Sequence, residues 1–393
     1  MQFPKSEKLE LELTSKCTLF CPNCPRTYQA DQRKIWDNGH INHEALIEWL
    51  KSTGFTRFQL GGAYGDGIYH PHLVATLRAI KAMGPGHHFN FDTNGSYRSE
   101  KDWQAIADLM TRKDCIIFSI DGTPANFTQY RVNADWPSIE KGARIIAKGN
   151  GRCRWKYIVF KYNQTFEDMK TAYDTAMDIG FPEFVIVHTH RAEAGQLANK
   201  EDFDENLTKL EEYVYNLSPP SMIGRQWAQP KLNVAVTPRT SMFKVKEIIE
   251  NKEQNVHEKH VSNGKGNDIT LLKNKPDNKE IKLNVNKQRR YQWAPTIVKD
   301  PIHTEKVSPQ CINMKNHSNF ISSDGNFLPC CYMRVNQQDH FDHAGITKED
   351  EKSLSIYNNT FDEIIEGVAI KKIMSNFDNI ELCTRQCKKA KAI

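Results

Sequence analysis

Three cysteines near the amino terminus have a spacing that suits a metal cluster. Cys17, Cys21 and Cys24 stand in TSKCTLFCPNCPRT, a C-x3-C-x2-C arrangement. A structural zinc ion takes four ligands in a closed tetrahedron, whereas a [4Fe-4S] cube held by three cysteines leaves one iron with open coordination positions. The spacing therefore predicts an iron–sulfur cluster whose open iron binds a further molecule. A zinc site with a distant fourth ligand, or three unrelated thiols, is the alternative.

A second group of cysteines lies toward the carboxyl terminus. It comprises Cys311, Cys330, Cys331, Cys383 and Cys387. In a reducing compartment such groups are metal ligands more often than disulfides. The sequence shows neither an apolar run of membrane-spanning length nor a signal-peptide pattern, so we expect a cytoplasmic protein. Cys115 and Cys153 fall in or beside strand patterns and are expected to be buried apolar residues.

The elements that must position these residues alternate along the first half of the chain. Short runs of β-branched and apolar residues alternate with stretches of helical periodicity. The expected strands are 8–14, 56–60, 88–92, 115–120, 154–160 and 183–188, and the expected helices are 42–52, 71–83, 100–112, 137–148 and 165–179. Repeated βα units predict parallel strands joined by right-handed crossovers. We expect an α/β fold, a partial (β/α)6 TIM-like barrel, with its chemistry at the carboxyl ends of the strands.

The composition changes after about residue 216, where Ser218-Pro219-Pro220 ends the helical pattern. Residues 240–292 contain 12 Lys and Arg against 7 Asp and Glu, which equals the +5 net charge of the whole chain. We expect a polar basic insertion or linker at 217–305, with a substrate-docking arm as the alternative. The predicted domains are the barrel at 1–216, this insertion, and a small cysteine-rich domain at 306–393. The small net charge requires neither a nucleic acid nor a membrane as partner.

The cysteine loop and the strand ends that follow it resemble the radical S-adenosylmethionine superfamily. The C-x3-C-x2-C loop follows the first expected strand, LGGAYGDGIYHPHL ends the second, and FDTNGS and FSIDGT end the third and fourth. In that superfamily the open iron chelates the amino and carboxylate groups of S-adenosylmethionine. Gly65, Asp66 and Gly67 stand where the family usually has Gly-Glu-Pro, and glycines there let the backbone approach a ligand closely.

The resemblance implies a set of contacts to S-adenosylmethionine at these strand ends. The implied contacts are Gly62, Gly65, Asp66, Asn94, Ser119, Asp121 and Asn163. Ser119 and Asp121 are assigned to the ribose or the carboxylate of the cofactor. Tyr130-Arg131 places a cation near the cofactor or substrate, or forms a surface salt bridge.

The C-terminal cysteines resemble the auxiliary-cluster extensions called SPASM and twitch domains. CINMKNHSNFISSDGNFLPCC matches their opening C-x(9–15)-G-x4-C, in which Ser323-Asp324-Gly325 is also a turn signal. Five cysteines are too few for the two clusters of a full SPASM domain and fit one auxiliary [4Fe-4S] cluster. The implied ligands are Cys311, Cys330, Cys383 and Cys387, with Cys331 spare or a replacement. A zinc knuckle is the alternative.

The resemblance also implies a reaction. A reduced cluster passes one electron to S-adenosylmethionine, and the resulting 5′-deoxyadenosyl radical takes a hydrogen atom from the substrate. We expect an enzyme that receives electrons from a reductant such as flavodoxin or ferredoxin and modifies a peptide or protein side chain. A small-molecule substrate, such as a sugar, aminoglycoside or nucleotide, is the first alternative. His188 and His190, at the end of the sixth strand, are the candidate substrate contacts. A non-catalytic zinc or nucleic-acid-binding protein is the second alternative.

Overall fold

The structure, a computed structural model, divides into two compact units. One consists of Met1–Arg239 with Ile302–Ile393, and the other is Thr240–Pro301. The residues it describes are 7–28, 39–188, 198–217, 231–236, 261–262, 268–269, 318–335, 337–376, 379–380 and 383. In the second unit, β8 (Val261–Ser262) and β9 (Asp268–Ile269) pair antiparallel.

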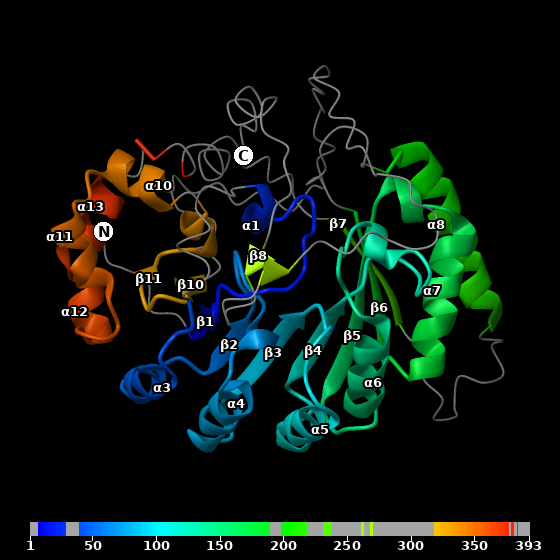
Figure 1. Ribbon diagram of the computed structural model, residues 1–393, viewed down its shortest axis with the longest axis horizontal. Helices are drawn as coiled ribbons and strands as arrows, with labels where there is room; N and C mark the ends of the chain where they lie inside the picture. The colour runs from blue at the N-terminus through cyan, green and yellow to red at the C-terminus, as the bar shows by residue number, and fades with distance from the viewer. Residues whose placement is uncertain are drawn as a thin grey trace, which may run out of the picture. The chain divides into compact units, whose positions relative to one another are not determined.

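The first unit is built on a nine-stranded sheet in the order β11-β10-β1-β2-β3-β4-β5-β6-β7 (Figure 1). Every neighbouring pair is parallel except β10 and β11, which are antiparallel. The strands are β1 Lys8–Leu11, β2 Arg57–Leu60, β3 His88–Thr93, β4 Cys115–Ser119, β5 Arg152–Val159, β6 Glu183–His188, β7 Lys231–Val236, β10 Ser318–Ile321 and β11 Phe327–Leu328.

The six predicted strands are confirmed as β1 to β6, in parallel and in chain order. Two extensions of the sheet were not predicted. β7 pairs with β6, and β10 pairs with the opposite side of β1, where Lys8 is in register with Ser318. The C-terminal region therefore contributes strands to the same sheet as the barrel. The domain boundaries at 216 and 306 stay predictions.

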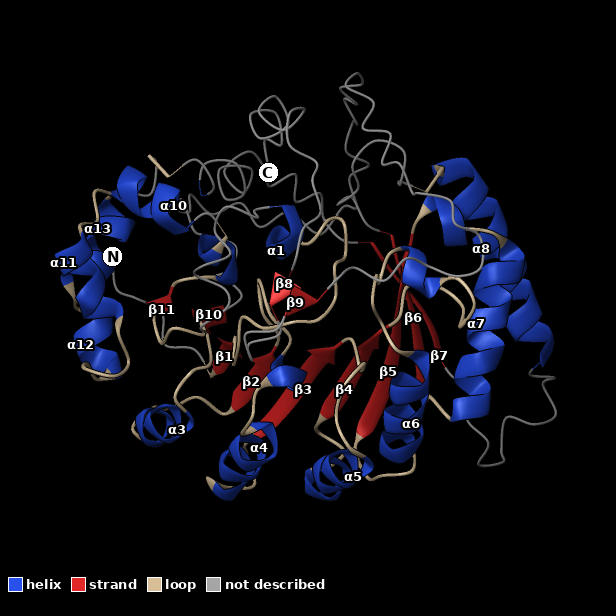
Figure 2. Cartoon of the chain, viewed as in Figure 1, coloured by secondary structure: helices blue, strands red, loops and turns tan. Residues whose placement is uncertain are grey.

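The helices between the strands cover one face of this sheet (Figure 2). They are α3 His43–Lys51, α4 Leu73–Ala82, α5 Glu100–Leu109, α6 Trp136–Ala147, α7 Phe166–Ile179 and α8 Lys200–Leu217. Several begin where a polar side chain accepts a backbone N–H of the first turn, as Asn42, Ser99 and Thr165 do. The predicted end of the helix at 165–179 is confirmed, since α7 stops at its C-cap Gly180 with φ +98°.

The core lies between this helical layer and the sheet. Alternate residues of a strand point to opposite faces, and in β3 Phe89 and Phe91 are fully buried while Asn90 between them is partly exposed. Cys115 and Cys153 are buried as predicted, the second inside β5 rather than before it. Polar side chains occupy the other face, where Asp92 accepts hydrogen bonds from Gln59 at 2.5 Å and Lys156 at 2.6 Å.

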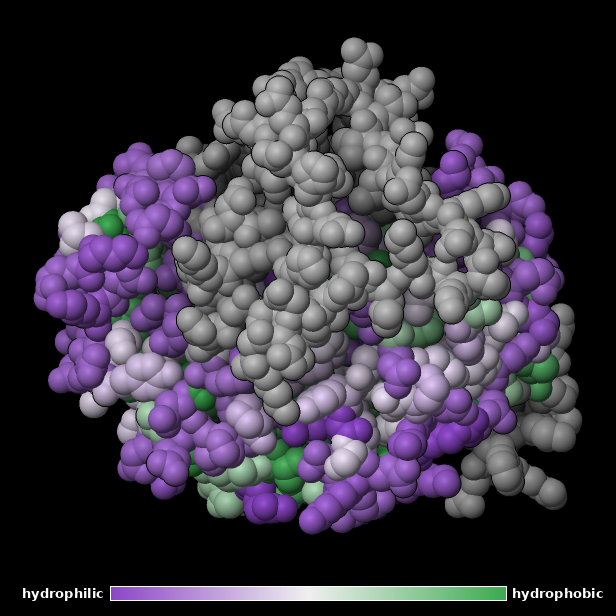
Figure 3. Space-filling model, in the orientation of Figure 1, coloured by the Kyte–Doolittle hydropathy of each residue, from purple (hydrophilic) through white to green (hydrophobic). Residues whose placement is uncertain are grey.

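The C-terminal region is helical after β11. Its helices are α10 Gln337–Ala344, α11 Lys348–Glu351, α12 Phe361–Ile365 and α13 Val368–Ser375. The stretch 361–374, whose sequence has a helical pattern, forms two helices, because α12 ends at its C-cap Glu366 and Gly367, in an extended conformation, is the N-cap of α13. On the face shown in Figure 3 the described residues are mainly hydrophilic, with small apolar areas. Among the described residues, none of the helices combines the length and apolarity needed to cross a membrane.

Candidate functional site

The cysteine loop begins where β1 ends and leads into the short helix α1 (Pro25–Tyr28). Its path is held by backbone bonds, including Ser15 N–H to Gly39 O at 2.8 Å and Cys24 N–H to Cys21 O at 3.0 Å. Arg26 closes the loop on itself by donating to the carbonyl of Cys17 at 2.6 Å. The three cysteines are therefore ordered by one compact turn at the carboxyl edge of the sheet.

Apolar side chains surround the three thiols. Cys21 is buried together with Leu19, Tyr130 and Phe160, and Cys17 and Cys24 pack against this group. The rings of Tyr130 and Phe160 stack with their centroids 4.1 Å apart. Burial raises the pKa of the Cys21 thiol to about 11 and that of Cys17 further. A thiolate in these surroundings needs a positive charge beside it. Bound metal ions supply that charge, and the thiols lose their protons when they bind the metal.

Hydrogen-bond donors and one cation lie beside the sulfur atoms. The Sγ of Cys17 accepts from Leu19 N–H at 3.5 Å and from Asn94 Nδ2 at 3.6 Å. The guanidinium of Arg131 lies 4.0 Å from the Sγ of Cys21. Such donors and charges are what set the properties of thiolate-bound iron–sulfur clusters. The surroundings of the three cysteines thus fit a buried cluster.

In the described ranges of the chain, no group of three or more His, Cys, Asp or Glu side chains is arranged to hold a metal ion. Zinc at the amino-terminal cysteines stays an alternative prediction.

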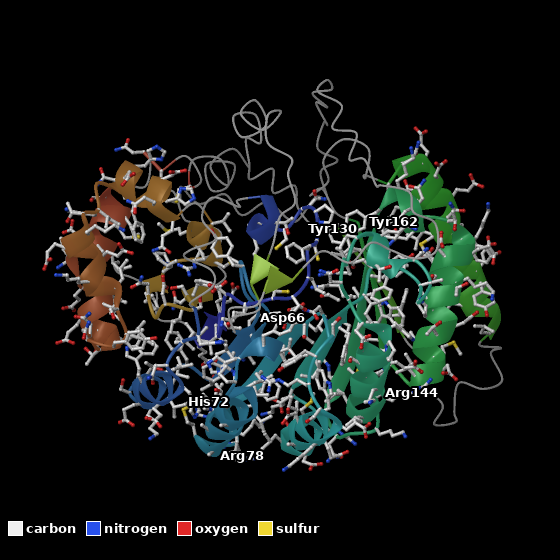
Figure 4. The ribbon with its side chains drawn as sticks, in the orientation of Figure 1. Asp66, His72, Arg78, Tyr130, Arg144 and Tyr162 are labelled. Atoms are coloured by element: carbon white, nitrogen blue, oxygen red, sulfur yellow. The ribbon has the colours of Figure 1, made fainter. Side chains whose placement is uncertain are left out.

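Asp66 and Asn94 join the ends of β2 and β3 to the cysteine loop. Figure 4 labels Asp66 near these strand ends. The Oδ2 of Asp66 accepts from Asn94 N–H at 2.6 Å, from Asn94 Nδ2 at 2.7 Å and from Thr93 Oγ1 at 3.2 Å. Burial raises the pKa of Asp66 to about 6, although these donors act in the opposite direction. Since Asn94 also contacts Cys17, two of the predicted cofactor contacts lie beside a predicted cluster ligand.

The predicted glycines allow close backbone packing at this edge. A Cβ on Gly65 would overlap the carbonyl of Thr14, just before the cysteine loop. A Cβ on Gly62 would lie 2.7 Å from the carbonyl oxygen of Gly65 and 3.0 Å from Glu12 Oε1. The glycine-rich segment therefore packs against the residues that lead to Cys17, which only glycine permits.

Asp121 anchors a cation beside the cysteine loop. It is fully buried, and its Oδ2 accepts from Arg131 Nε at 2.6 Å while its Oδ1 accepts from Ile158 N–H at 2.9 Å. The Arg131 side chain is only 16% exposed, so the surface salt bridge considered from the sequence is wrong. Ser119, the last residue of β4, is 8% exposed nearby. The sequence contained the residues of this pair but no signal that they pair.

Asn163 and Tyr162 hold the ends of β4 and β5 together. The Nδ2 of Asn163 donates to the carbonyls of Asp121 and Ile158 at 3.0 Å each, and its Oδ1 accepts from Phe160 N–H at 2.6 Å. The hydroxyl of Tyr162 donates to the carbonyl of Asp121. The amide of Asn163 is thus engaged with backbone, which indicates a positioning role for this predicted contact.

Part of the C-terminal cysteine group is described. Gly325, with φ +82°, makes the turn between β10 and β11, as the turn signal predicted, and Cys330 follows β11. Cys330 and Cys383 are buried, and Cys331 lies beside Glu10 of β1, whose negative charge joins burial in raising the pKa of that thiol. Cys311 and Cys387 lie outside the described residues, as do His190 and the side chain of His188.

The solved structures that share this fold include SuiB and anSMEcpe. SuiB from Streptococcus suis, in a crystal structure bound to precursor peptide SuiA, is 13% identical with a TM-score of 0.52; the match covers 85% of this chain and 61% of the SuiB chain. Native anSMEcpe with bound AdoMet is 12% identical with a TM-score of 0.50, and the match covers 97% of this chain and 88% of that one.

The predicted α/β partial barrel is thereby confirmed as the fold found in radical S-adenosylmethionine enzymes. The chain spans about three fifths of the length of SuiB. No protein-family model matches the sequence. No curated protein matches it either.

Proposed function

We propose that this chain, which has the fold of the radical S-adenosylmethionine enzymes, catalyses a reaction of that type. One observation carries the proposal: Asn94 contacts both Cys17 and Asp66, so the cysteine loop meets the ends of β2 and β3 at one place. Cys17, Cys21 and Cys24 would hold a [4Fe-4S] cluster there. Such a cluster, once reduced, would supply one electron to S-adenosylmethionine, whose carbon–sulfur bond would break to give methionine and a 5′-deoxyadenosyl radical that takes a hydrogen atom from the substrate.

The residues around the loop are suited to bind, orient and exclude water. Leu19, Tyr130 and Phe160 keep solvent from the thiols, which protects a reactive intermediate from side reactions. Asp66 and Arg131 supply charges of opposite sign at the same edge of the sheet. The proposed contacts of S-adenosylmethionine are Gly62, Gly65, Asp66, Asn94, Ser119 and Asp121. Asn163 is assigned a positioning role.

A second cluster is part of the proposal. Cys311, Cys330, Cys383 and Cys387 are the proposed ligands of one auxiliary [4Fe-4S] cluster. The support is the hairpin of β10 and β11, in which Gly325 turns the chain and Cys330 follows, buried, after β11. With four cysteine ligands such a cluster suits electron transfer rather than substrate binding.

The proposed substrate is a peptide or protein side chain. The support is the likeness to SuiB, whose structure is bound to a precursor peptide. A small molecule is the alternative substrate. The proposed electron donor is a flavodoxin or ferredoxin, and the proposed compartment is the cytoplasm.

The proposal is tested on the full-length chain, reconstituted anaerobically with iron and sulfide. We expect roughly eight irons per chain for two cubes, and release of 5′-deoxyadenosine when reductant and S-adenosylmethionine are added. Cys21→Ala should lose the cleavage, and Cys115→Ala, which alters a buried cysteine of β4, should keep it. Protein that binds about two zinc ions and no iron would contradict the proposal.

A further inference from the structure

A buried ion pair links the C-terminal cysteine segment to the first strand region of the barrel. Arg334 ends the short helix that begins at Cys331, and its Nε donates to Glu12 Oε2 at 3.2 Å. The two side chains are 3% and 0% exposed. Removing one partner of such a pair leaves a buried charge without compensation, at a cost of about 3–5 kcal/mol. The pair therefore restrains both segments strongly.

Glu12 also holds the glycine-rich segment between β2 and the 3-10 helix at Gly67–Tyr69. Its Oε1 accepts from the backbone N–H of Tyr64 at 2.9 Å. The hydroxyl of Tyr64 donates to the carbonyl of Arg334 at 3.1 Å, and the guanidinium of Arg334 lies 5.5 Å from the centre of the Tyr64 ring. Tyr64 is thus held at its backbone by Glu12 and at its hydroxyl by Arg334.

Arg334 reaches the hairpin turn as well. Its Nη1 donates to Asp324 Oδ2 at 2.9 Å and its Nη2 donates to Ser323 Oγ at 3.3 Å. The backbone N–H of Ser323 in turn donates to Glu12 Oε2 at 3.3 Å. One guanidinium therefore ties together the end of β1, the turn between β10 and β11, and the segment that carries Cys330 and Cys331.

We propose that the Arg334–Glu12 pair couples the C-terminal cysteine segment to the binding of S-adenosylmethionine. The inference rests on the proposed function, because it assigns the segment Gly61–Asp66 to that cofactor. With Arg334 in place, Glu12 holds Tyr64, and the segment keeps the conformation that binds. Coupling between two sites is reciprocal. Binding of S-adenosylmethionine therefore also stabilises the segment around Cys330 and Cys331. Arg334 is a positioning residue in this scheme.

The first test needs no cofactor. Hydrogen exchange of the peptide that contains Tyr64 is measured in full-length protein as purified, for wild type, Arg334→Met, Glu12→Gln and the double variant. We expect faster exchange in both single variants and a partial return in the double variant, because removing both charges leaves neither one unpaired. Arg144→Met is the control, since the ion pairs of Arg144 with Glu140 of α6 and Asp178 of α7 are exposed to solvent. Unchanged exchange in Arg334→Met would overturn the structural half of the inference.

The second test measures binding. Equilibrium dialysis of S-adenosylmethionine against anaerobically reconstituted protein should show at least about fivefold weaker binding by Arg334→Met, with partial rescue in Arg334→Lys. In wild type, S-adenosylmethionine should slow exchange in residues 327–335, and Arg334→Met should lose that effect. Wild-type binding that is matched by Arg334→Met would overturn the coupling and leave the proposed function intact. Iron-loaded wild type that binds no S-adenosylmethionine would overturn the proposed function and the coupling with it.

Should Arg334→Met fail to fold, the variant Tyr64→Phe tests the coupling instead. It removes only the hydroxyl that donates to the carbonyl of Arg334. Weaker binding of S-adenosylmethionine by this variant, with the unfolding midpoint of wild type, supports the coupling. Equal binding by Tyr64→Phe and wild type, with equal exchange of residues 61–66, would contradict it.

Discussion

The guanidinium of Arg131 donates to the Oδ2 of Asp121 at 2.6 Å while another of its nitrogens lies 4.0 Å from the Sγ of Cys21. The ion pair is nearly buried, with Asp121 fully so. A cation that is held in this way beside a proposed cluster ligand would act electrostatically on that cluster, and its ion pair with Asp121 stabilises the fold.

Arg131→Met removes this cation and leaves Asp121 buried without its partner. We expect the free energy of unfolding to fall by about 3–5 kcal/mol, measured by chemical denaturation of the protein without iron. In reconstituted protein the reduction potential of the amino-terminal cluster should become more negative, since a nearby positive charge favours the reduced form, and redox titration measures this. Arg131→Lys, which keeps the charge, should lie between the two. An unchanged potential in Arg131→Met would show that the cation does not act on the cluster.

The two cysteine groups should have separable effects on the reaction. Cys21→Ala is expected to abolish cleavage of S-adenosylmethionine, because it removes a proposed ligand of the cluster that would bind the cofactor. Cys383→Ala should retain some cleavage and lose the modified product, because it alters only the proposed auxiliary cluster. Both are followed by chromatography of 5′-deoxyadenosine and by the mass of the product. Equal loss of cleavage in both variants would contradict separate roles.

Gly65 should not tolerate a side chain. In Gly65→Ala the new methyl group would overlap the backbone of Thr14, and overpacking of this kind costs about 1–3 kcal/mol. We expect that loss in chemical denaturation, together with weaker binding of S-adenosylmethionine. Gly54→Ala is the matched control, since a Cβ there meets no atom within 4 Å. Equal stability of the two variants would show that the close contact at Gly65 is unimportant.

Acid should destabilise the protein through His70. This residue is fully buried, its Nε2 donates to the carbonyl of Ile41, and its Nδ1 accepts from the backbone N–H of His72. Burial lowers the pKa of His70 to about 4. The unfolded chain, with a histidine pKa of about 6.5, then binds the proton more readily than the folded chain. The stability that this residue contributes is complete above about pH 6.5 and is lost as the pH falls toward 4.

The expected loss between those pH values is at most about 3 kcal/mol, measured as the free energy of unfolding in urea. His70→Gln, which keeps a donor for Ile41, should reduce the pH dependence. His40 and His43 should account for part of what remains, because burial lowers the pKa of each. His343→Gln, at an exposed position of α10, should leave the profile unchanged. If His70→Gln and wild type lost stability identically as the pH falls, His70 would not be a source of the acid sensitivity.

Local pattern was enough to predict much of this molecule. The strands β1 to β6, the helices between them and the turn at Gly325 all depend on periodicity and on cap or turn residues a few positions apart. The C-x3-C-x2-C loop is equally local. The repeated βα pattern predicted the α/β barrel that the structure shows, and the position of the loop after β1, with the polar strand ends after it, carried the resemblance to the superfamily.

Only the tertiary structure decided which distant residues meet. Glu12 and Arg334 are 322 residues apart in the chain, Asp121 could have been exposed, and β10 follows a long segment whose composition carries no pairing signal. A charged side chain in a sequence looks the same whether it is solvated or buried with a partner. Its partner is set by how the whole chain closes around a common core, where an unpaired charge is too costly to remain. Spacing therefore predicts the elements and the cysteine motif, and packing determines which charges lie beside them.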